Sequence, residues 1–340
     1  MKKIAMLTSG GDAPGMNACI RAAVRYGLFK KVEMYGVMRG YEGLINGDFY
    51  KMDRHSVTDI IQRGGTILKT ARSERFFSEE GRGAASEKLR ERGIEGLVVI
   101  GGDGSFNGAK RLAAESDICV ACVPGTIDND LNYTDYTLGF DTAVNTVLNA
   151  VNNIRDTMSS HDRACIVEVM GRSCGDIALF SAIGGGADAV VMPEKGLDLK
   201  ALAAQLEQGR RLGKSSNIIL LSEGVCTAQA LKEGLAAHTD MSLRTVTLGH
   251  VQRGGSPTLR DRLLAARFGV KAIDCLTEGR KAVAIGIRNE ETVADDLEDA
   301  LCAPAADRSE LLRVAKYFAF NGIQKGKKTN ENSDFCSGHA

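Results

Sequence analysis

Short apolar runs separated by turn residues recur along the whole chain. Residues 4–7, 97–100 and 118–123 are runs of this kind, and their unbroken apolar character is typical of strands buried in a parallel sheet. In segments such as 142–158, apolar residues return at intervals of three and four, which predicts helices. Strands that alternate with helices predict an α/β fold with mainly parallel sheets.

The same pattern predicts most of the remaining elements. Strands are expected at 32–37, 164–170, 189–194, 218–224, 245–248 and 282–287, and helices at 20–28, 261–276 and 311–320. Residues 40–44 contain two glycines and are expected to form a loop. Residues 323–340 are polar and have little to bury, so they are expected to form a disordered tail.

Length and charge narrow the classes of protein. The chain has 340 residues, more than one average domain, so two lobes that share a cleft are expected. Its 43 Lys and Arg residues balance 43 Asp and Glu residues, which argues against nucleic acid or a membrane as a partner. No apolar run approaches the roughly 20 residues that span a bilayer, and no signal peptide is evident at the start, so a cytoplasmic location is expected.

Cys119 and Cys122 have the spacing of a redox or zinc motif, but they lie within one expected strand. An offset of three places their thiols on opposite faces of that strand. Packing in the core is therefore favoured over redox or metal chemistry.

The glycine-rich segment 8–17 (TSGGDAPGMN) follows the first expected strand and precedes a helical pattern. Backbone N–H groups and a helix N-terminus in this arrangement can hold phosphate. The segment has neither the Walker A pattern nor Gly-x-Gly-x-x-Gly, so a tight turn is the alternative. Arg21 and Arg25 lie one helical turn apart and could form a second anion site, with a solvated helix face as the alternative.

A second glycine-rich turn, 101–105 (GGDGS), follows the expected strand 97–100. Consecutive glycines allow the backbone to approach a phosphate chain closely. Asp103 is suited to Mg²⁺, which binds one or two carboxylates together with phosphate oxygens. Ser105 is expected to cap the following helix. A nucleotide site is favoured over a plain turn.

The segment 124–130 (PGTIDND) follows the expected strand 118–123, so it should begin at the strand's carboxyl end, where open α/β sheets bind ligands. Thr126, Asp128 and Asp130 alternate along it and can offer a hydroxyl and a proton acceptor to one small substrate. A strand-to-loop turn with solvated carboxylates is the alternative.

Other expected strands also end in charged residues beside small ones. Arg172 and Glu223 follow two such strands, and His250 and Arg253 precede a glycine pair after a third. Arg72 follows another glycine pair and could direct its guanidinium at a phosphate. So many charged strand ends favour a cleft over an ordinary surface.

Five stretches occur in order along the chain: GGDAPGMN at 10–17, GGDGS at 101–105, PGTIDND at 124–130, MGR at 170–172 and GHVQRGGSP at 249–257. Together they resemble the bacterial type of ATP-dependent 6-phosphofructokinase, over residues 4 to about 320. The resemblance implies transfer of the ATP γ-phosphoryl group to the 1-hydroxyl of fructose 6-phosphate with Mg²⁺, in the first committed step of glycolysis. It also implies two Rossmann-like, three-layer α/β/α lobes: an ATP-binding lobe of 1–138 plus 252–305, and a fructose 6-phosphate-binding lobe of 139–251 plus 306–322.

The resemblance assigns roles by motif. Asp128 would be the base, aided by Thr126, Arg72 and Arg172. ATP would be held by Gly11, Arg72, Ser73, Gly102, Asp103, Gly104 and Ser105, with Asp103 also binding Mg²⁺. Fructose 6-phosphate would be held by Thr126, Ile127, Asp128, Arg163, Met170, Gly171, Arg172, Glu223, Arg244, His250, Val251, Gln252 and Arg253. Arg163 and Arg244 would reach a neighbouring subunit's site in a homotetramer.

The resemblance also implies allosteric control by ADP or phosphoenolpyruvate at a subunit interface. The matching positions are Arg21, Ala22, Ala23, Val24, Arg25, Arg54, Asp59, Arg155, Gly186, Ala187, Asp188 and Lys214. The basic cluster of the family is thinned around Lys214, and the segment 73–77 also departs from the family pattern. An effector site of altered affinity is expected.

Three other functions are possible for a chain with these motifs. Pyrophosphate-dependent relatives carry Asp and Lys where this chain has Gly104 and Gly125, so ATP is the expected donor. The GGDGS stretch also occurs in NAD kinases and diacylglycerol kinases, but 170–172 and 249–257 serve a sugar phosphate. A non-catalytic sensor with the same fold is a further alternative, against which the intact catalytic set argues.

Overall fold

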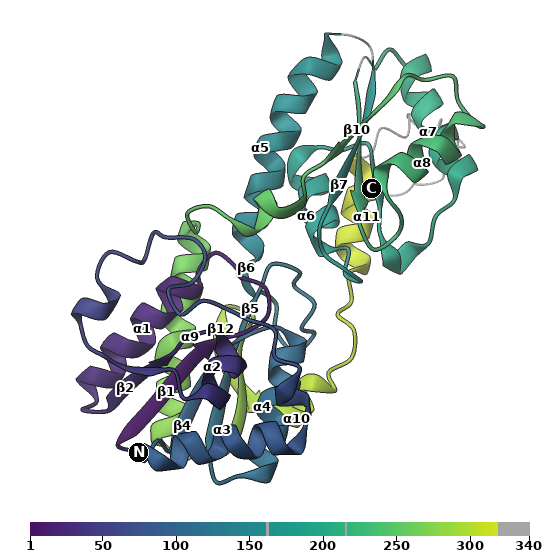
Figure 1. Cartoon of the computed structure of the whole chain (residues 1–340). Coiled ribbons are helices and arrows are strands. Elements are labelled where there is room, and N and C mark those ends of the chain that lie inside the picture. The colour runs from purple at the N-terminus through teal and green to yellow at the C-terminus, as the bar shows by residue number, and fades with distance from the viewer. Residues whose placement is uncertain (161–162, 215, 319–340) are drawn as a thin grey trace, which may run out of the picture.

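The chain folds into two α/β lobes, each built around a mainly parallel sheet (Figure 1). The computed structural model describes residues 1–160, 163–214 and 216–318. The strands of the large sheet lie in the order β12-β11-β5-β4-β1-β2-β3, with β6 beside β5, and those of the small sheet in the order β10-β7-β9-β8. The predicted α/β fold with two lobes is confirmed. The lobe boundaries expected from the sequence are a proposal, which the two separate sheets support.

The strands of the large sheet are β1 (Lys3–Thr8), β2 (Glu33–Val37), β3 (Phe49–Met52), β4 (Gly96–Gly101), β5 (Cys119–Thr126), β6 (Leu138–Gly139), β11 (Ala282–Arg288) and β12 (Glu291–Asp296). Those of the small sheet are β7 (Ala164–Val169), β8 (Ala189–Val191), β9 (Asn217–Ser222) and β10 (Leu243–Thr247). Only the pairs β2–β3 and β11–β12 are antiparallel among the described strands.

The helices are α1 (Met16–Phe29), α2 (Gly40–Asn46), α3 (Glu79–Glu91), α4 (Asp103–Glu115), α5 (Phe140–Ser159), α6 (Asp176–Gly185), α7 (Leu199–Arg211), α8 (Ala228–Ala236), α9 (Leu259–Thr277), α10 (Leu297–Leu301) and α11 (Ser309–Phe318). Short 3₁₀ turns lie at His55–Val57, Arg75–Phe77, Pro193–Lys195 and Gly249–Arg253. No described helix is long and apolar enough to cross a membrane.

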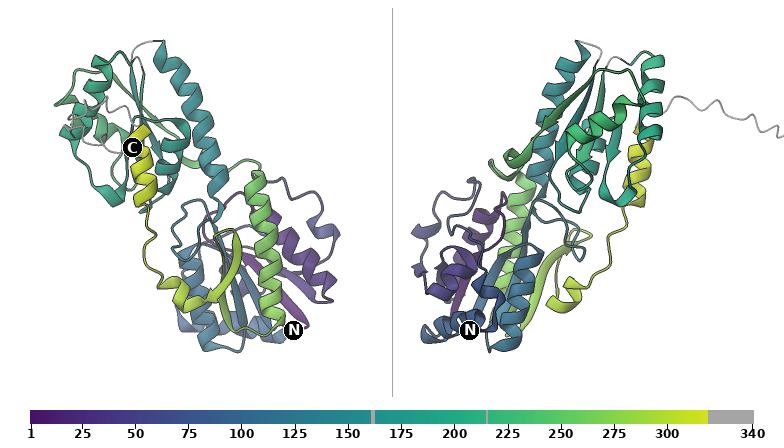
Figure 2. Two further views of the ribbon diagram at one scale, coloured as in Figure 1. Left: turned by 180° about the vertical axis from the view of Figure 1, so that it is seen from behind. Right: turned by 45° about the vertical axis from the view of Figure 1, so that its right-hand side comes forward.

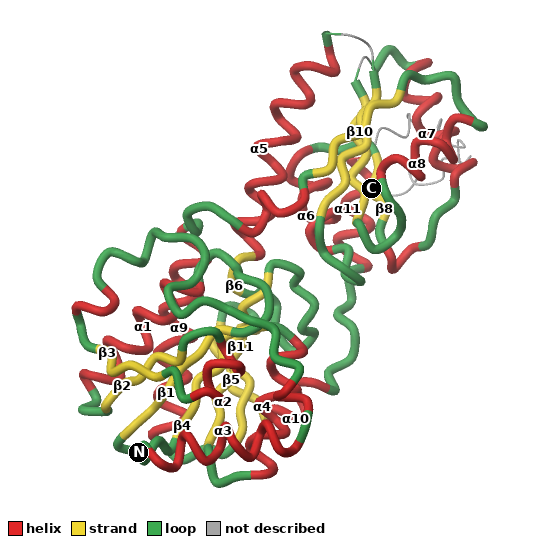
Figure 3. Tube along the Cα trace, in the orientation of Figure 1, coloured by secondary structure: helices red, strands yellow, loops and turns green. Residues whose placement is uncertain are grey.

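Helices cover both faces of the large sheet (Figure 3), because alternate strand residues are apolar on both sides. On β4, Val98 packs with the helices α1 and α9, whereas Leu97 and Val99 pack with α2, α3 and α4. Cys119 and Cys122 also contact these opposite cores, as predicted, and all described cysteines are free thiols.

The chain passes between the lobes three times within the described residues (Figure 2). It leaves the large lobe through α5, returns after β10 through Gly249–Arg253 to α9, and leaves again after α10 to form α11. The buried Asp261 of α9 holds the N-terminus of α5 against α9. Its carboxylate accepts hydrogen bonds from the N–H groups of Gly139 and Thr142, each at 2.9 Å. Burial raises the pKa of Asp261 to about 6.

Three local predictions were wrong. Residues 40–44 begin the helix α2 instead of a loop, because Tyr41, Leu44 and Ile45 bury a helical face despite the glycines. The strand before PGTIDND does not end at Val123, because Gly125 and Thr126 continue it by pairing with β6. Ser105 does not cap α4, since the helix already begins at Asp103.

Several elements were not anticipated from the sequence, namely α3, α6, α7, α8, α10, β3, β6 and β12. Four of these five helices have N-cap side chains that mark their start in the sequence, among them Asp296 of α10, which accepts a hydrogen bond from the N–H of Glu298. Ser78 begins α3, Asp198 begins α7 and Thr227 begins α8, each by accepting a hydrogen bond from an N–H three residues on. The expected tail at 323–340 lies outside the described residues.

Candidate active site

The carboxyl ends of β1, β4 and β5 meet at one cavity of about 470 Å³. The order of the large sheet reverses between β1 and β4, and open α/β sheets bind ligands at such a switch point. The cavity brings together these predicted residues: Gly11, Arg72, Ser73, Gly102, Asp103, Gly104, Ser105, Thr126, Asp128, Arg172 and Arg253.

Asp128 lies just beyond β5 and is only 1% exposed. Its Oδ1 atom has no hydrogen-bond partner among the described residues, and its Oδ2 atom lies 3.4 Å from Nε of Arg172. Burial raises the pKa of Asp128, and the nearby charge of Asp130 raises it further, while Arg172 and Arg253 oppose both effects. A buried carboxylate with an unsatisfied oxygen can accept a proton from a bound hydroxyl.

Thr126 fixes the turn that presents Asp128. Its hydroxyl accepts a hydrogen bond from the backbone N–H of Asp128 at 3.2 Å, and its carbonyl accepts one from the hydroxyl of Thr137 at 2.6 Å. The backbone that leads into Asp128 is therefore held by hydrogen bonds within residues 126–137.

Asp103 and Asp130 form the acidic part of the cavity that suits a divalent cation. Oδ1 of Asp130 is buried without a partner among the described residues, and the charge of Asp103 helps burial to raise the pKa of Asp130. The described part of the chain has no cluster of three or more acidic, His or Cys ligands. Mg²⁺ needs only one or two carboxylates when phosphate oxygens and water complete its shell, so this pair fits the ion.

The other end of the cavity is aromatic. Tyr41 and Phe76 are stacked with their ring centroids 3.9 Å apart, and a side chain at Gly108 of α4 would contact both rings. Phe77 is 76% exposed and also lines the cavity. This end can hold a flat base. The sequence pattern does not predict this end, because Tyr41 lies on α2, where a loop was expected, and Phe76 lies on the turn at 75–77.

Gly11 allows two distant segments to meet. A side chain at this position would collide with the guanidinium of Arg253, whose Nη1 atom donates to the carbonyl of Asp12 at 3.3 Å. The close approach places a cation from the turn after β10 beside the glycine turn after β1.

The ends of β7, β9 and the turn at 249–253 are joined around Arg172. The N–H of Arg172 donates to Glu223 at 3.1 Å, and the N–H of Met170 donates to the side chain of Gln252 at 3.3 Å. Gly171 and Arg172 have φ angles of 133° and 51°, so the chain turns sharply and directs Arg172 toward Asp128.

Other predicted residues lie apart from this cavity. Arg163 precedes β7 and Arg244 pairs with Cys165 early in β7, so both lie at the end of the small sheet opposite to Arg172. Arg244 is inside β10, which starts earlier than predicted. His250 and Val251 are exposed, and the side chain of Ile127 is buried in the core.

The predicted effector residues fall into two groups, in different lobes (Figure 1). One group lies on α1 and near the turn at 55–57, where Ala23 and Val24 are buried. The other lies within α5, after α6 and after α7. Arg155 of α5 donates to the carbonyl of Gly186 at 2.8 Å, and Lys214 forms an ion pair with Asp188.

Comparisons with known proteins identify the family of this chain. Residues 3–276 match the family model described as phosphofructokinase. The chain is 53% identical over 320 residues to the ATP-dependent 6-phosphofructokinase of Clostridium novyi, covering 94% of this chain and 100% of the relative. It is also 53% identical over 315 residues to the enzyme of the same description from Clostridium botulinum (strain Loch Maree), covering 93% of this chain and 98% of the relative.

Solved structures are similar as well. A phosphofructokinase from Saccharomyces cerevisiae superposes with a TM-score of 0.84 at 34% identity over 94% of this chain, which spans 47% of the yeast chain. A pyrophosphate-dependent phosphofructokinase from Marinobacter aquaeolei gives a TM-score of 0.81 at 18% identity, over 94% of this chain and 92% of that one. The second likeness shows the fold alone.

Proposed function

The chain belongs to the phosphofructokinase family, and from this premise we propose how its residues divide the work of the reaction. It catalyses the ATP-dependent phosphorylation of fructose 6-phosphate, a step of glycolysis. We propose that the phosphoryl group goes to the 1-hydroxyl and that Asp128 accepts the proton of that hydroxyl. The observation that supports this role is the buried, unsatisfied Oδ1 atom of Asp128 beside the guanidinium of Arg172.

The glycine turns at 10–11 and 102–104 would cradle the phosphates of ATP, and the Tyr41–Phe76 pair would support its base. Asp103 and Asp130 would hold Mg²⁺, which neutralises phosphate charge when bound. Arg72, Thr126 and Arg172 would steady the transferring group. Positioning and neutralisation supply most of the catalysis in phosphoryl transfer, so this set of residues matches its needs.

The residues proposed for the sugar phosphate are Met170, Gly171, Arg172, Glu223, His250, Val251, Gln252 and Arg253. Arg172 and Arg253 support this assignment because they line the cavity, and Glu223 accepts a hydrogen bond from the N–H of Arg172. Arg163 and Arg244 lie at the end of the small sheet opposite to Arg172. This position favours their binding substrate in the site of a neighbouring subunit. We therefore include a homotetramer with shared sites in the proposal.

The pH profile tests the electrostatics of the base. Asp128 works as a base only when ionised, so kcat/KM for ATP should fall as the pH falls through the pKa of Asp128. Burial and the charge of Asp130 raise this pKa above its ordinary value. Asp130→Asn removes that charge and should move the acidic limb of the profile to lower pH, whatever its effect on the maximal rate. A limb that stays in place, or moves to higher pH, would contradict the arrangement.

Regulation by a ligand at the predicted effector residues is also part of the proposal. The Lys214–Asp188 ion pair occupies groups that an effector phosphate or its metal would need, which supports an altered affinity. Added ADP should still shift the fructose 6-phosphate saturation curve, measured at fixed ATP. A curve that does not move at any ADP concentration up to the onset of product inhibition would exclude the effector site.

A further inference from the structure

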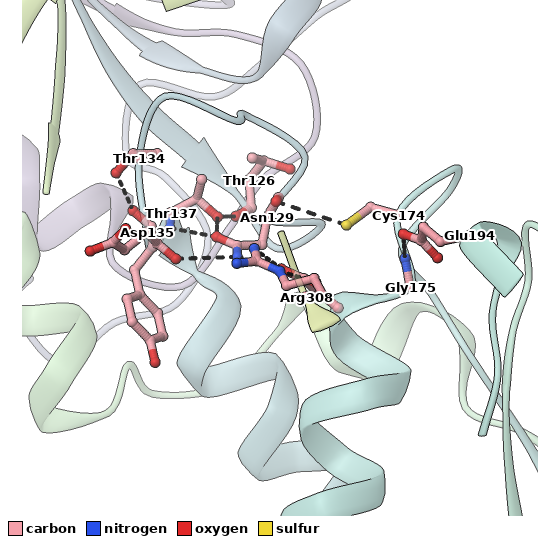
Figure 4. A network of polar contacts seen from close by, with 11 residues as sticks. Thr126, Asn129, Thr134, Asp135, Thr137, Cys174, Gly175, Glu194 and Arg308 are labelled. Carbon is pink, nitrogen blue, oxygen red and sulfur yellow. Dashed lines mark hydrogen bonds and ion pairs between the residues drawn. The ribbon is translucent and has the colours of Figure 1, made fainter. Parts of the chain in front are cut away.

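Asn129 lies between Asp128 and Asp130 in the sequence and has a left-handed backbone conformation, with a φ angle of 54°. Its side chain closes the loop that follows β5. The side-chain oxygen accepts from the N–H of Thr137 at 3.0 Å, and the side-chain nitrogen donates to the carbonyl of Asp135 at 3.3 Å (Figure 4). The position of Asp128 relative to Asp130 therefore depends on how Asn129 is held.

The small lobe supplies a further partner. The nitrogen of Asn129 also donates to Oδ2 of Asp176 at 2.8 Å. Asp176 is the first residue of α6 and is 1% exposed, so this bond is shielded from water. It joins the catalytic loop of the large lobe to a rigid helix of the small lobe.

Arg308 holds Asp176 in turn. Its Nε atom lies 2.9 Å from Oδ1 and its Nη2 atom 2.5 Å from Oδ2 of the same carboxylate, a bidentate ion pair. Arg308 belongs to the segment between α10 and α11, the last of the crossings from one lobe to the other. Asp176 therefore contacts two other parts of the chain: the loop after β5, through Asn129, and the segment that leads to α11, through Arg308.

We propose that Arg308 and Asp176 are positioning residues for the phosphoryl transfer: acting through Asn129, they tie the placement of Asp128 to the docking of the small lobe. The proposal rests on the proposed role of Asp128 as the base. Because Asn129 adjoins both aspartates, a small rotation of its peptide moves the proton acceptor relative to the bound hydroxyl. A misplacement of about 1 Å can lower a rate about 100-fold.

The test compares Arg308→Met with the native chain. The substitution keeps much of the side-chain volume and removes the bidentate ion pair with Asp176. It should lower kcat by about 10- to 100-fold and leave the KM for ATP within about twofold, because the nucleotide residues belong to other strand ends. Amide hydrogen exchange of residues 127–137, measured by mass spectrometry, should accelerate relative to β4. Arg308→Lys should restore part of both losses.

Arg210→Met is the matched control. Arg210 of α7 forms an ion pair with Glu207 at 2.7 Å in the small lobe and does not line the cavity. It should leave both kcat and the exchange of 127–137 at native values. If Arg308→Met does not fold, because the carboxylate of Asp176 is left buried without its counter-ion, the double variant Asp176→Asn/Arg308→Met removes both charges and is measured in its place.

The readouts separate this proposal from the proposed function. A slower kcat with faster exchange supports the positioning role. Native kcat, or a slower kcat with unchanged exchange, overturns it. The exchange measurement does not depend on the chemistry of Asp128, so it still reports whether Arg308 holds residues 127–137 if an active Asp128→Asn variant overturns the assignment of the base.

Discussion

Asp128→Asn is expected to lower kcat by about three to four orders of magnitude and to change the KM for fructose 6-phosphate by no more than a few-fold. The amide has nearly the same shape as the carboxylate but cannot accept the proton of the attacking hydroxyl. It also removes the charge that faces Arg172 at 3.4 Å. Steady-state kinetics with ADP formation as the readout measure both constants.

Asp295→Asn is the control for this variant, since Asp295 is likewise a carboxylate paired with an arginine, but outside the cavity. It should keep native kinetics. An Asp128→Asn variant with a tenth of the native kcat would exclude Asp128 as the base. A loss of activity together with a large drop in the unfolding midpoint would instead point to a structural role for the carboxylate.

Gly104→Asp is expected to raise the KM for ATP by roughly 100-fold, since opposing like charges in a binding site cost several kcal/mol. Gly104 faces open space in the cavity: a side-chain carbon there would meet no atom within 4 Å. The new carboxylate therefore fits, but it lies beside Asp103, where the proposal places the phosphates of ATP.

Gly104→Ala is the matched control, because it adds the carbon without the charge. Its KM for ATP should stay near the native value, and the helix α4 should gain up to about 1 kcal/mol of stability. If alanine weakens ATP binding as much as aspartate does, the effect is steric and the phosphates do not lie beside Gly104. If neither substitution changes the KM, the nucleotide binds elsewhere.

Gly125, the other position that distinguishes ATP from pyrophosphate as the expected donor, has less space around it than Gly104. A side-chain carbon at Gly125 would lie 2.8 Å from Ile100 and 3.1 Å from Met16. A lysine there, as in the pyrophosphate-dependent relatives, requires both neighbours to move. Exchange of the phosphoryl donor in this chain therefore needs changes in the core around β4 and α1 as well as at positions 104 and 125.

The parts of the site that follow directly from local sequence were predictable. Buried strands read as apolar runs, and the glycine turns come directly after β1 and β4, so their meeting at one sheet edge follows from parallel topology. Asp103 and Asp128 were placed correctly at strand ends for this reason. The roles of these residues came from the family resemblance, which covers five motifs in order.

Contacts between distant segments were not predictable. Asp176 is 47 residues from Asn129, and Arg308 is 132 residues from Asp176, so no local pattern joins them. The Tyr41–Phe76 stack was not predicted because the glycines at 40 and 43 are typical of a loop. The buried residues of α2 nevertheless follow helical spacing. The capping role predicted for Ser105 is wrong because α4 begins two residues earlier, after the extended Gly102, and no residue type in the sequence marks that start.

The most direct test of the central claim is the ³¹P NMR spectrum of the products formed from ATP and fructose 6-phosphate by the native chain and by Asp128→Asn. The account predicts that the native chain forms fructose 1,6-bisphosphate and ADP in equal amounts, and that the variant forms neither within the same time. Inorganic phosphate in place of the bisphosphate, phosphate on another hydroxyl, or product formation by the variant at a comparable rate would contradict it.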